Sequence, residues 1–183
     1  LQDRTAVVTG AGRGNGERIA KRLAADGARV VVNDLDRDPA VGTVEDIEAD
    51  GGEATAIAAD VSDTEAVDEM FETAADEFGS VDVLVNNAGV GKVQKFTEKP
   101  DDTLLDLNLD THLKGAYHCT RAALDGMTEQ GYGNVVNITS IHTKNGIGMS
   151  PQYDIGKFSL LGLTKTLALE LGREGIRVNA VAP

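Results

Sequence analysis

The sequence predicts an α/β fold in which helices cover both faces of one doubly wound parallel sheet. Short runs rich in valine alternate with longer stretches of helical periodicity along the whole chain, and such alternation is typical of parallel strands joined by crossover helices. The run Arg29–Asn33 is nearly continuous in valine, as strands buried on both faces are. A glycine-rich stretch directly follows the first run. These observations favour three layers, with ligands at the carboxyl ends of the strands.

The expected elements follow one another in regular order. Strands are expected at Thr5–Thr9, Arg29–Asn33, Ala54–Ala58, Val81–Val85, Asn134–Thr139 and Ile176–Val181. Helices are expected through Ile19–Ala24 and near residues 41–50, 65–78, 101–129 and 151–171. Gly27 is expected to end the first helix, because glycine readily adopts the left-handed conformation of a C-terminal cap. With 183 residues and no repeat or low-complexity linker, residues 1–183 are expected to form a single domain.

Charge and hydropathy narrow the classes of partner. The chain has 17 basic and 30 acidic side chains, for a formal net charge of −13. Such a charge disfavours nucleic acid, whose phosphates need lysine and arginine, and an anionic membrane surface. No apolar run approaches the roughly 20 residues of a membrane span, and no signal-peptide pattern opens the sequence. We therefore expect a cytoplasmic protein without nucleic-acid or membrane partners.

The acidic residues are concentrated at 34–38, 45–50 and 63–77, which are expected to be solvated helix and loop faces. A hypothesis for the large net charge is a salt-adapted source, because high ionic strength screens self-repulsion. A stability scan that shows no gain between dilute buffer and molar salt would count against this hypothesis.

Metal binding and disulfide formation are not expected. The single cysteine, Cys119, lies within a helical pattern and is interpreted as a small buried hydrophobe. The three histidines, His112, His118 and His142, are scattered and lack metal-ligand spacing.

The glycine-rich stretch predicts a dinucleotide site. Gly10, Gly14 and Gly16 lie between the first strand and the first helix, where glycine permits unusual dihedral angles and close approach to a pyrophosphate. A glycine-rich turn without a ligand is the alternative. Asp34, just past the second strand, can accept hydrogen bonds from both adenosine ribose hydroxyls and would repel a 2′-phosphate. This favours NAD over NADP, although Arg13 in the same loop could attract that phosphate.

A tyrosine and a lysine at helical spacing predict the chemistry. Tyr153 lies four residues before Lys157, so both side chains share one helical face. An ammonium beside a phenol favours the phenolate and moves its pKa from about 10 toward neutral pH. Such a phenol can donate and accept the proton when an alcohol and a carbonyl are interconverted. The pair alone is a weak signal, and it is strengthened by Ser140 and the nucleotide loop upstream.

Four motifs in the right order make the chain resemble the short-chain dehydrogenase/reductase family over nearly its whole length. They are the Thr-Gly-x-x-x-Gly-x-Gly pattern at Thr9–Gly16, the pair Asp60-Val61, the sequence Asn86-Asn87-Ala88-Gly89, and Ser140, Tyr153 and Lys157 at the family spacing. The resemblance implies a Rossmann fold and a nicotinamide dinucleotide cofactor. The cofactor-binding residues it implies are Gly10, Arg13, Gly14, Asn15, Gly16, Asp34, Leu35, Asp60, Val61, Asn87, Ala88, Gly89, Tyr153, Lys157 and Pro183.

Two departures from the family pattern concern single side chains. Members usually carry an asparagine three residues before a glycine in the helix ahead of the fifth strand, where it helps hold a water in a proton relay to the lysine. Here His112 stands at that distance from Gly115, and Asn108 lies one turn earlier. Because histidine can donate and accept at once, we favour His112 in the relay. The alternatives are substitution by Asn108, an altered relay, or a merely packed histidine. Asn15 stands where the family tends to have an aliphatic residue.

The resemblance implies a reversible alcohol dehydrogenase or carbonyl reductase acting on a small molecule. Ser140 would bind the substrate oxygen, Tyr153 would transfer the proton, and Lys157 would activate the tyrosine and hold the nicotinamide ribose. Asn33-Asp34-Leu35 with His112 is similar to the 3-hydroxyacyl-CoA dehydrogenase branch, and 3-oxoacyl thioester reductases are a second resemblance. Steroids, sugars and small secondary alcohols are the alternative substrates. The alternative is a non-catalytic dinucleotide-binding sensor or scaffold. Such a protein would not need an intact Ser140, Tyr153 and Lys157.

The family also implies further structure and assembly. Its last strand and the loop that closes over substrate would follow Pro183, and the chain is expected to lack both. Its members form homodimers or homotetramers through two helices, expected here at 101–129 and 151–171. Each is apolar over more than one face, which predicts a second partner to cover it.

Overall fold

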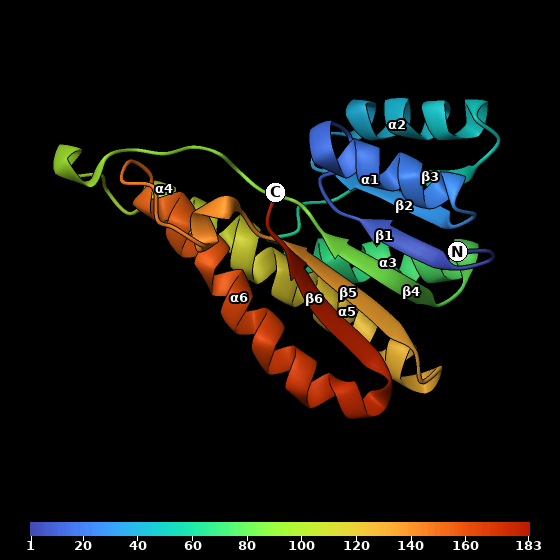
Figure 1. The fold of residues 1–183 in the computed structure, drawn as a ribbon. Helices are drawn as coiled ribbons and strands as arrows, with labels where there is room; N and C mark the ends of the chain where they lie inside the picture. The colour runs from blue at the N-terminus through green and yellow to red at the C-terminus, as the bar shows by residue number, and fades with distance from the viewer.

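The structure is a computed structural model that describes residues 1–183. Six strands form one sheet in the order β3-β2-β1-β4-β5-β6, and every neighbouring pair is parallel (Figure 1). The strands are β1 Thr5–Val8, β2 Arg29–Asp34, β3 Glu53–Ala58, β4 Val81–Asn86, β5 Gly133–Ile138 and β6 Ile176–Val181. The predicted doubly wound parallel sheet is therefore confirmed.

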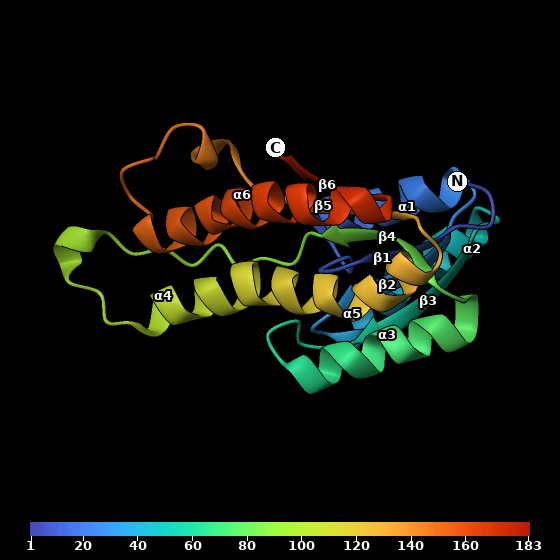
Figure 2. The same cartoon turned by 90° about the horizontal axis from the view of Figure 1, so that it is seen from below.

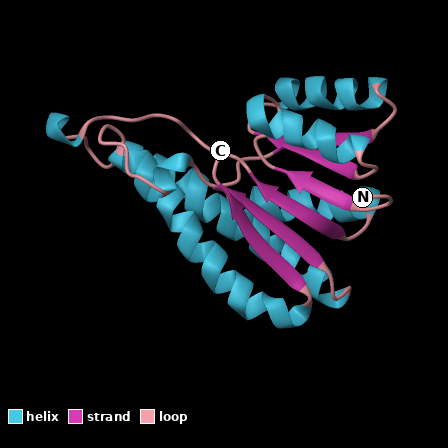
Figure 3. Ribbon diagram, in the orientation of Figure 1, coloured by secondary structure: helices cyan, strands magenta, loops and turns pink.

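Helices cover both faces of the sheet and complete three layers (Figures 2 and 3). They are α1 Gly14–Ala25, α2 Arg37–Ala49, α3 Thr64–Phe78, α4 Thr103–Asn108, α5 Gly115–Glu129 and α6 Pro151–Leu171. Side chains alternate between the faces because successive residues of a strand point in opposite directions. Val7 and Leu84 pack in one core with residues of α3, α5 and α6, whereas Val8 and Val30 pack in the other with residues of α1 and α2.

The long helix predicted at 101–129 is two α-helices joined by a wider π-helical turn at Leu109–Lys114. A π turn adds one residue to a helical turn and breaks the regular backbone ladder, and such turns are frequent at functional sites. His112 lies in this turn and is buried. The turn therefore positions the His112 ring against the Val90 N–H and the Tyr153 ring.

Smaller differences from the sequence prediction concern boundaries and short turns. The second helix begins at Arg37, four residues before the start expected from its pattern. Single 3-10 turns at Phe96–Glu98, Ile141–Thr143 and Gly172–Glu174 were not predicted, because three residues carry no periodic signal. Gly27 has a φ of 93° and follows the end of α1, as expected for a helix terminus.

None of the helices combines the length and the apolarity needed to cross a membrane. No group of three or more His, Cys, Asp and Glu side chains is arranged to hold a metal ion.

Candidate active site

The glycine loop between β1 and α1 is shaped by close backbone approach. Gly10 and Gly14 have positive φ angles of 59° and 64°, which L side chains rarely adopt. A Cβ on Gly10 would lie 2.8 Å from the Cα of Ala88, and a Cβ on Gly16 would collide with the Gly10 carbonyl oxygen. The first turn of α1 begins at Gly14, and the N–H groups of a first helical turn have no partner within the helix. The loop therefore offers free donors to a phosphate, without side chains in the way.

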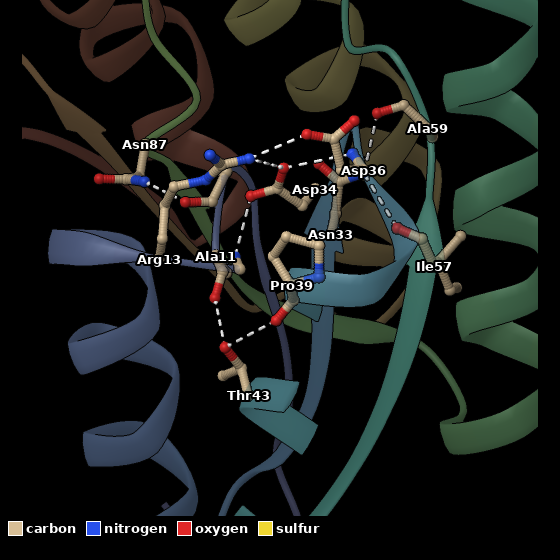
Figure 4. Close-up of polar contacts among 12 residues, drawn as sticks. Ala11, Arg13, Asn33, Asp34, Asp36, Pro39, Thr43, Ile57, Ala59 and Asn87 are labelled. Carbon is tan, nitrogen blue, oxygen red and sulfur yellow. Dashed lines mark hydrogen bonds and ion pairs between the residues drawn. The ribbon is translucent and has the colours of Figure 1, made fainter. Parts of the chain in front are cut away.

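Asp34 ends β2 next to this loop. Its carboxylate is buried and accepts hydrogen bonds from the Gly12 N–H at 2.9 Å and the Asp36 N–H at 3.3 Å. The Arg13 guanidinium lies 2.9 Å from Asp36 and 3.8 Å from Asp34, and Figure 4 shows it extended toward both carboxylates. Arg13 is thus already paired with acid, and its charge is partly neutralised.

A cleft of about 610 Å³ opens beside these carboxylates. Among the predicted cofactor residues, its lining includes Gly10, Arg13, Asn15, Asp34, Leu35, Asp60, Val61, Asn87, Ala88 and Gly89. Leu35 is 67% exposed, although it is large and apolar. An apolar side chain beside hydrogen-bonding carboxylates matches what a purine ring and its ribose require.

His118 and Gly115 position the Asp60–Val61 segment of this cleft. The ring of His118 contacts the Val61 carbonyl oxygen through Nδ1 at 3.2 Å, and a Cβ on Gly115 would lie 2.6 Å from Val61 Cγ2. The sequence pattern did not reveal this role of His118, because the contact joins residues 57 positions apart.

Thr9 and Asn87 fasten the loop after β1 to the loop after β4. The Asn87 amide donates to the carbonyl oxygens of Thr9 and Gly10, each at 2.9 Å. In return, the Thr9 hydroxyl accepts from the N–H groups of Asn87 and Ala88, each at 3.0 Å. The threonine was visible only as part of a motif, but its hydroxyl proves to hold the two loops together.

A second cavity, of about 380 Å³, continues from this cleft toward β5, β6 and α6. Its lining includes Asn15, Asn87, Gly89, Val90, His112, Ser140, Tyr153, Lys157 and Pro183. Asn15, Asn87, Gly89 and Val90 line both cavities, so the two form one cleft along the carboxyl ends of the strands. The predicted catalytic residues thus meet in one place, next to the predicted nucleotide site.

Lys157 is nearly inaccessible to solvent, at 4% exposure, and donates to the Ile138 carbonyl oxygen at 2.8 Å. Its Nζ lies 6.0 Å from the centre of the Tyr153 ring. Burial disfavours the charged ammonium and lowers the pKa of Lys157 to about 8. The lysine therefore stays mostly protonated at neutral pH, and its charge lies in a poorly solvated place.

His112 is also buried and packs against Tyr153, with ring centres 5.5 Å apart and planes at 88°. Its Nε2 accepts from the Val90 N–H at 3.0 Å, whereas Nδ1 is buried without a partner. A Cβ on Gly156 would lie 2.6 Å from that Nδ1, so the glycine makes room for the ring. Burial and the charge of Lys157 lower the pKa of His112 to about 3, which keeps the ring neutral with its proton on Nδ1.

Asn108, the alternative relay residue, uses its amide nitrogen elsewhere, whereas its Oδ1 is buried without a partner. Its amide donates to the Leu104 carbonyl oxygen at 2.7 Å and to that of Lys92 at 3.2 Å. These bonds hold the segment after β4 against α4.

Ser140 and Tyr153 come from different elements. Ser140 follows β5 and is buried, and its Oγ accepts from the His142 N–H at 3.2 Å. Tyr153 lies in the first turn of α6. An accepted bond at the serine oxygen leaves the hydroxyl proton free for another acceptor.

A third hollow, of about 430 Å³, lies near the amino ends of β2 and β3 and is lined by residues such as Gln2, Lys21 and Glu53. It adjoins none of the predicted site residues. Ligands of open α/β sheets bind at the carboxyl ends of the strands, so we assign the site to the opposite edge.

Comparisons with known proteins agree with this geometry. A family profile described as short chain dehydrogenase matches residues 4–183. The chain is 40% identical to the BbsD subunit of a hydroxy(phenyl)methyl-succinyl-CoA dehydrogenase from Thauera aromatica, over 100% of this chain and 73% of that protein. It is 42% identical to a 3-oxoacyl-(acyl-carrier-protein) reductase from Staphylococcus epidermidis, over 99% of this chain and 74% of that protein.

A sugar enzyme and a solved structure are similar to the same extent. An L-rhamnose 1-dehydrogenase (NAD(P)(+)) from Azotobacter vinelandii is 41% identical, over 100% of this chain and 73% of that protein. A crystal structure from Sinorhizobium meliloti, assigned as a short-chain alcohol dehydrogenase, superposes with a TM-score of 0.95 at 41% identity and covers 100% of this chain and 72% of that one. The chain therefore belongs to the short-chain dehydrogenase/reductase family and is an NAD(P)-dependent oxidoreductase acting on CH–OH groups.

Proposed function

We propose that the chain interconverts a secondary alcohol and its carbonyl compound with NAD, using Ser140, Tyr153 and Lys157. The observation that carries this proposal is the lining of one cavity by all three side chains, where it joins the cleft of the glycine loop and Asp34. A non-catalytic sensor or scaffold would need the cleft alone. The buried lysine argues against that alternative, because burying an ammonium is costly without a functional return.

The residues present fit a nicotinamide dinucleotide. The free N–H groups at the start of α1 would hold the pyrophosphate, Asp34 the adenosine ribose, and Tyr153 with Lys157 the nicotinamide ribose. Leu35, Asp60 and Val61 would border the adenine, and Asn87, Ala88, Gly89 and Pro183 would line the path between the two ends. When bound, the cofactor supplies the hydride acceptor or donor.

The protein's own side chains would handle the proton. In the oxidation direction, the phenolate oxygen of Tyr153 takes the hydroxyl proton of the alcohol while Ser140 donates a hydrogen bond to the same oxygen. The Lys157 ammonium stabilises the phenolate before the proton arrives. In the reduction direction, Tyr153 returns the proton to the forming alkoxide. The same tyrosine oxygen therefore accepts the proton in oxidation and donates it in reduction.

His112 enters this scheme as a neutral group. Its Nε2 accepts from the Val90 N–H, and its pKa is about 3. The ring would therefore hydrogen-bond a relay water without itself taking up the transferred proton. His112→Asn, which restores the usual family residue, should keep kcat within about tenfold of wild type, and His112→Leu should lose more. Equal activity of all three proteins in a steady-state assay would remove His112 from the relay.

A 3-hydroxyacyl or 3-oxoacyl thioester is the substrate class that we favour. Two loops lead away from the cavity, one after Gly91 and one after Ser140. The first is joined to α6 by the Gln94 N–H, which donates to the Gln152 side-chain oxygen at 3.5 Å. Exposed apolar side chains on these loops are Val93, Phe96, Ile141, Ile147 and Met149. Apolar side chains on the loops that leave the cavity would suit an acyl chain better than a sugar. Two of the relatives described above are named for acyl-CoA or acyl-carrier substrates.

A cofactor-reduction screen tests the function. Wild-type protein should reduce NAD with secondary alcohols or 3-hydroxyacyl thioesters, and it should do so better with thioesters than with sugars such as L-rhamnose. The screen is run in dilute buffer and in molar salt, because the net charge of −13 is proposed to favour high ionic strength. Tight dinucleotide binding without turnover of any substrate in either buffer would support the sensor alternative.

Cofactor preference provides a sharper prediction at Asp34. Asp34→Ala should lower kcat/KM for NAD by about 10–100-fold, because hydrogen bonds to a charged group contribute roughly 1.5–3 kcal/mol, and should lower it less for NADP. Asp36→Ala is the matched control: it frees Arg13 from its 2.9 Å partner and leaves the ribose acceptor in place. It should therefore favour NADP without a comparable loss with NAD. Wild-type preference for NADP would show that Arg13 outweighs Asp34.

We also propose that the chain forms a homodimer, or a tetramer built from such dimers. The helices α5 and α6 expose large apolar side chains, among them Tyr117, Ile155, Phe158 and Leu169, the last at 84% exposure. A second copy that packs on these helices would remove that surface from water. Light scattering in salt that keeps the protein folded should give a dimeric or larger mass, and a monomeric mass would refute the proposal.

A further inference from the structure

One histidine contacts both residues that are proposed to bind the reacting oxygen. The main-chain N–H of His142 donates to Ser140 Oγ at 3.2 Å. Its imidazole packs against the Tyr153 ring, with centres 5.2 Å apart and planes at 77°. The histidine therefore touches the serine through its backbone and the tyrosine through its side chain.

The carboxylate of Asp154 fixes this histidine. Asp154 directly follows Tyr153 on α6, and its Oδ1 lies 2.7 Å from His142 Nδ1. The same carboxylate accepts from the Ile147 N–H at 3.2 Å and from the Ser150 hydroxyl at 3.3 Å. One side chain at the start of α6 thus holds three points of the segment 141–150, which has little regular structure of its own.

We infer that His142 and Asp154 act as a positioning pair that sets the Ser140 hydroxyl against the Tyr153 hydroxyl. The inference rests on the proposed function, since it gives the pair a role in that reaction. The contacts form a continuous chain from Ser140 to Tyr153. The His142 N–H donates to Ser140 Oγ, the His142 ring contacts the Asp154 carboxylate, and Asp154 is the next residue after Tyr153. Ser140 and Tyr153 come from different elements, so their separation depends on such a tie.

The pair also sets proton positions. Asp154 is an acceptor when ionised, so it selects the form of His142 with a proton on Nδ1 and fixes the plane of the ring. The bond from the His142 N–H occupies one lone pair of Ser140 Oγ and leaves the serine proton for the substrate oxygen. Loss of the pair would loosen both groups by a fraction of an ångström to an ångström, and a displacement of that size can cost about 100-fold in rate.

The test uses two single variants and their combination in the full chain. His142→Phe keeps a ring against Tyr153 but removes Nδ1, and Asp154→Asn removes the charge but keeps a side chain of the same shape. Each should lower kcat by about 10–100-fold, with KM for NAD changed less than about twofold. The double variant should be no worse than the poorer single variant, because the residues act as one unit. Multiplicative losses in the double variant would overturn the inference.

Ser150→Ala is the matched control. It removes another hydrogen bond to the same carboxylate oxygen and leaves His142 in place, so kcat should stay within about twofold of wild type. A loss as large as that of Asp154→Asn would mean that Asp154 only anchors the loop, and normal kcat in Asp154→Asn would exclude any role of the pair.

A second readout separates this inference from the proposed function. Nitrogen NMR of the imidazoles should show His142 with its proton on Nδ1 in the wild type and a mixture of tautomers in Asp154→Leu, which has no acceptor at that position. An inactive wild type that keeps the Nδ1–H form would contradict the proposed function and leave the pair as a structural tie. Identical tautomer populations in the two proteins would overturn the pair itself.

Discussion

Replacing Tyr153 by phenylalanine is expected to lower kcat by about 10²–10⁴-fold, which is the usual contribution of a positioned general acid or base. NAD should still bind within about threefold of the wild-type affinity. The aromatic ring packs against both His112 and His142, and phenylalanine fills the same space. The variant therefore removes the hydroxyl and leaves the packing, so kcat falls without loss of the fold.

The measurements are steady-state kinetics with the best substrate of the screen and cofactor titration by fluorescence. Tyr132→Phe is the control, because Tyr132 lies in the turn between α5 and β5 and lines neither of the two cavities. It should behave as wild type. Normal turnover by Tyr153→Phe would reject the catalytic assignment. Equal losses of kcat in both variants would mean that removing a tyrosine hydroxyl lowers activity unspecifically, for example through a smaller fraction of folded protein.

The sequence could predict the layers and the contents of the site, because both follow from local patterns. Valine-rich runs such as 29–33 can be buried only within a sheet that is covered on both faces. Parallel strands bring the segments after them to one edge, so Gly10, Asp34 and Ser140 had to lie near one another. The spacing of Tyr153 and Lys157 placed them on one helical face. None of these steps needs knowledge of a long-range contact.

Details that depend on one extra residue or one distant partner could not be predicted. The π turn at Leu109–Lys114 leaves the apolar periodicity on both sides nearly intact, so a continuous helix was the natural interpretation. The sequence also gave no sign that Arg13 pairs with Asp36, because the two are 23 positions apart on different loops. The contact between Asp154 and His142 was likewise invisible in local patterns, because the two residues are 12 positions apart on different elements.

Lys157→Met is the second variant with a large expected effect, and it should change activity and stability in opposite directions. Methionine has a similar length and no charge. Loss of the ammonium beside Tyr153 should lower kcat by 100-fold or more, on the order expected when a catalytic acid loses its activating partner. The stability of the apo protein responds to a different property, namely the cost of burying that charge.

The sign of the stability effect follows from the pKa. Burial lowers the pKa of Lys157 in the folded protein to about 8 from an ordinary value of 10.5. Below about pH 8 the lysine is charged in both states, and the folded state bears the full cost of the buried charge. Between about pH 8 and pH 10.5 the unfolded chain binds more protons than the folded one, so wild-type stability gains from this group as the pH rises. Lys157→Met has no such gain.

The stability difference between variant and wild type should therefore shift in favour of wild type by about 2–3 kcal/mol between roughly pH 7 and pH 10, at 1.36 kcal/mol per pKa unit. The shift with pH is the cleaner quantity, because the bond that Lys157 donates to the Ile138 carbonyl oxygen changes the absolute difference without the same dependence on pH. Denaturant unfolding of apo protein at several pH values measures it. Lys165→Met is the control on the same helix, since Lys165 is exposed and its removal should leave the curves parallel. Parallel curves for Lys157→Met as well would show that the lysine is not charged in a poorly solvated place, and its proposed action on Tyr153 would lose its physical basis.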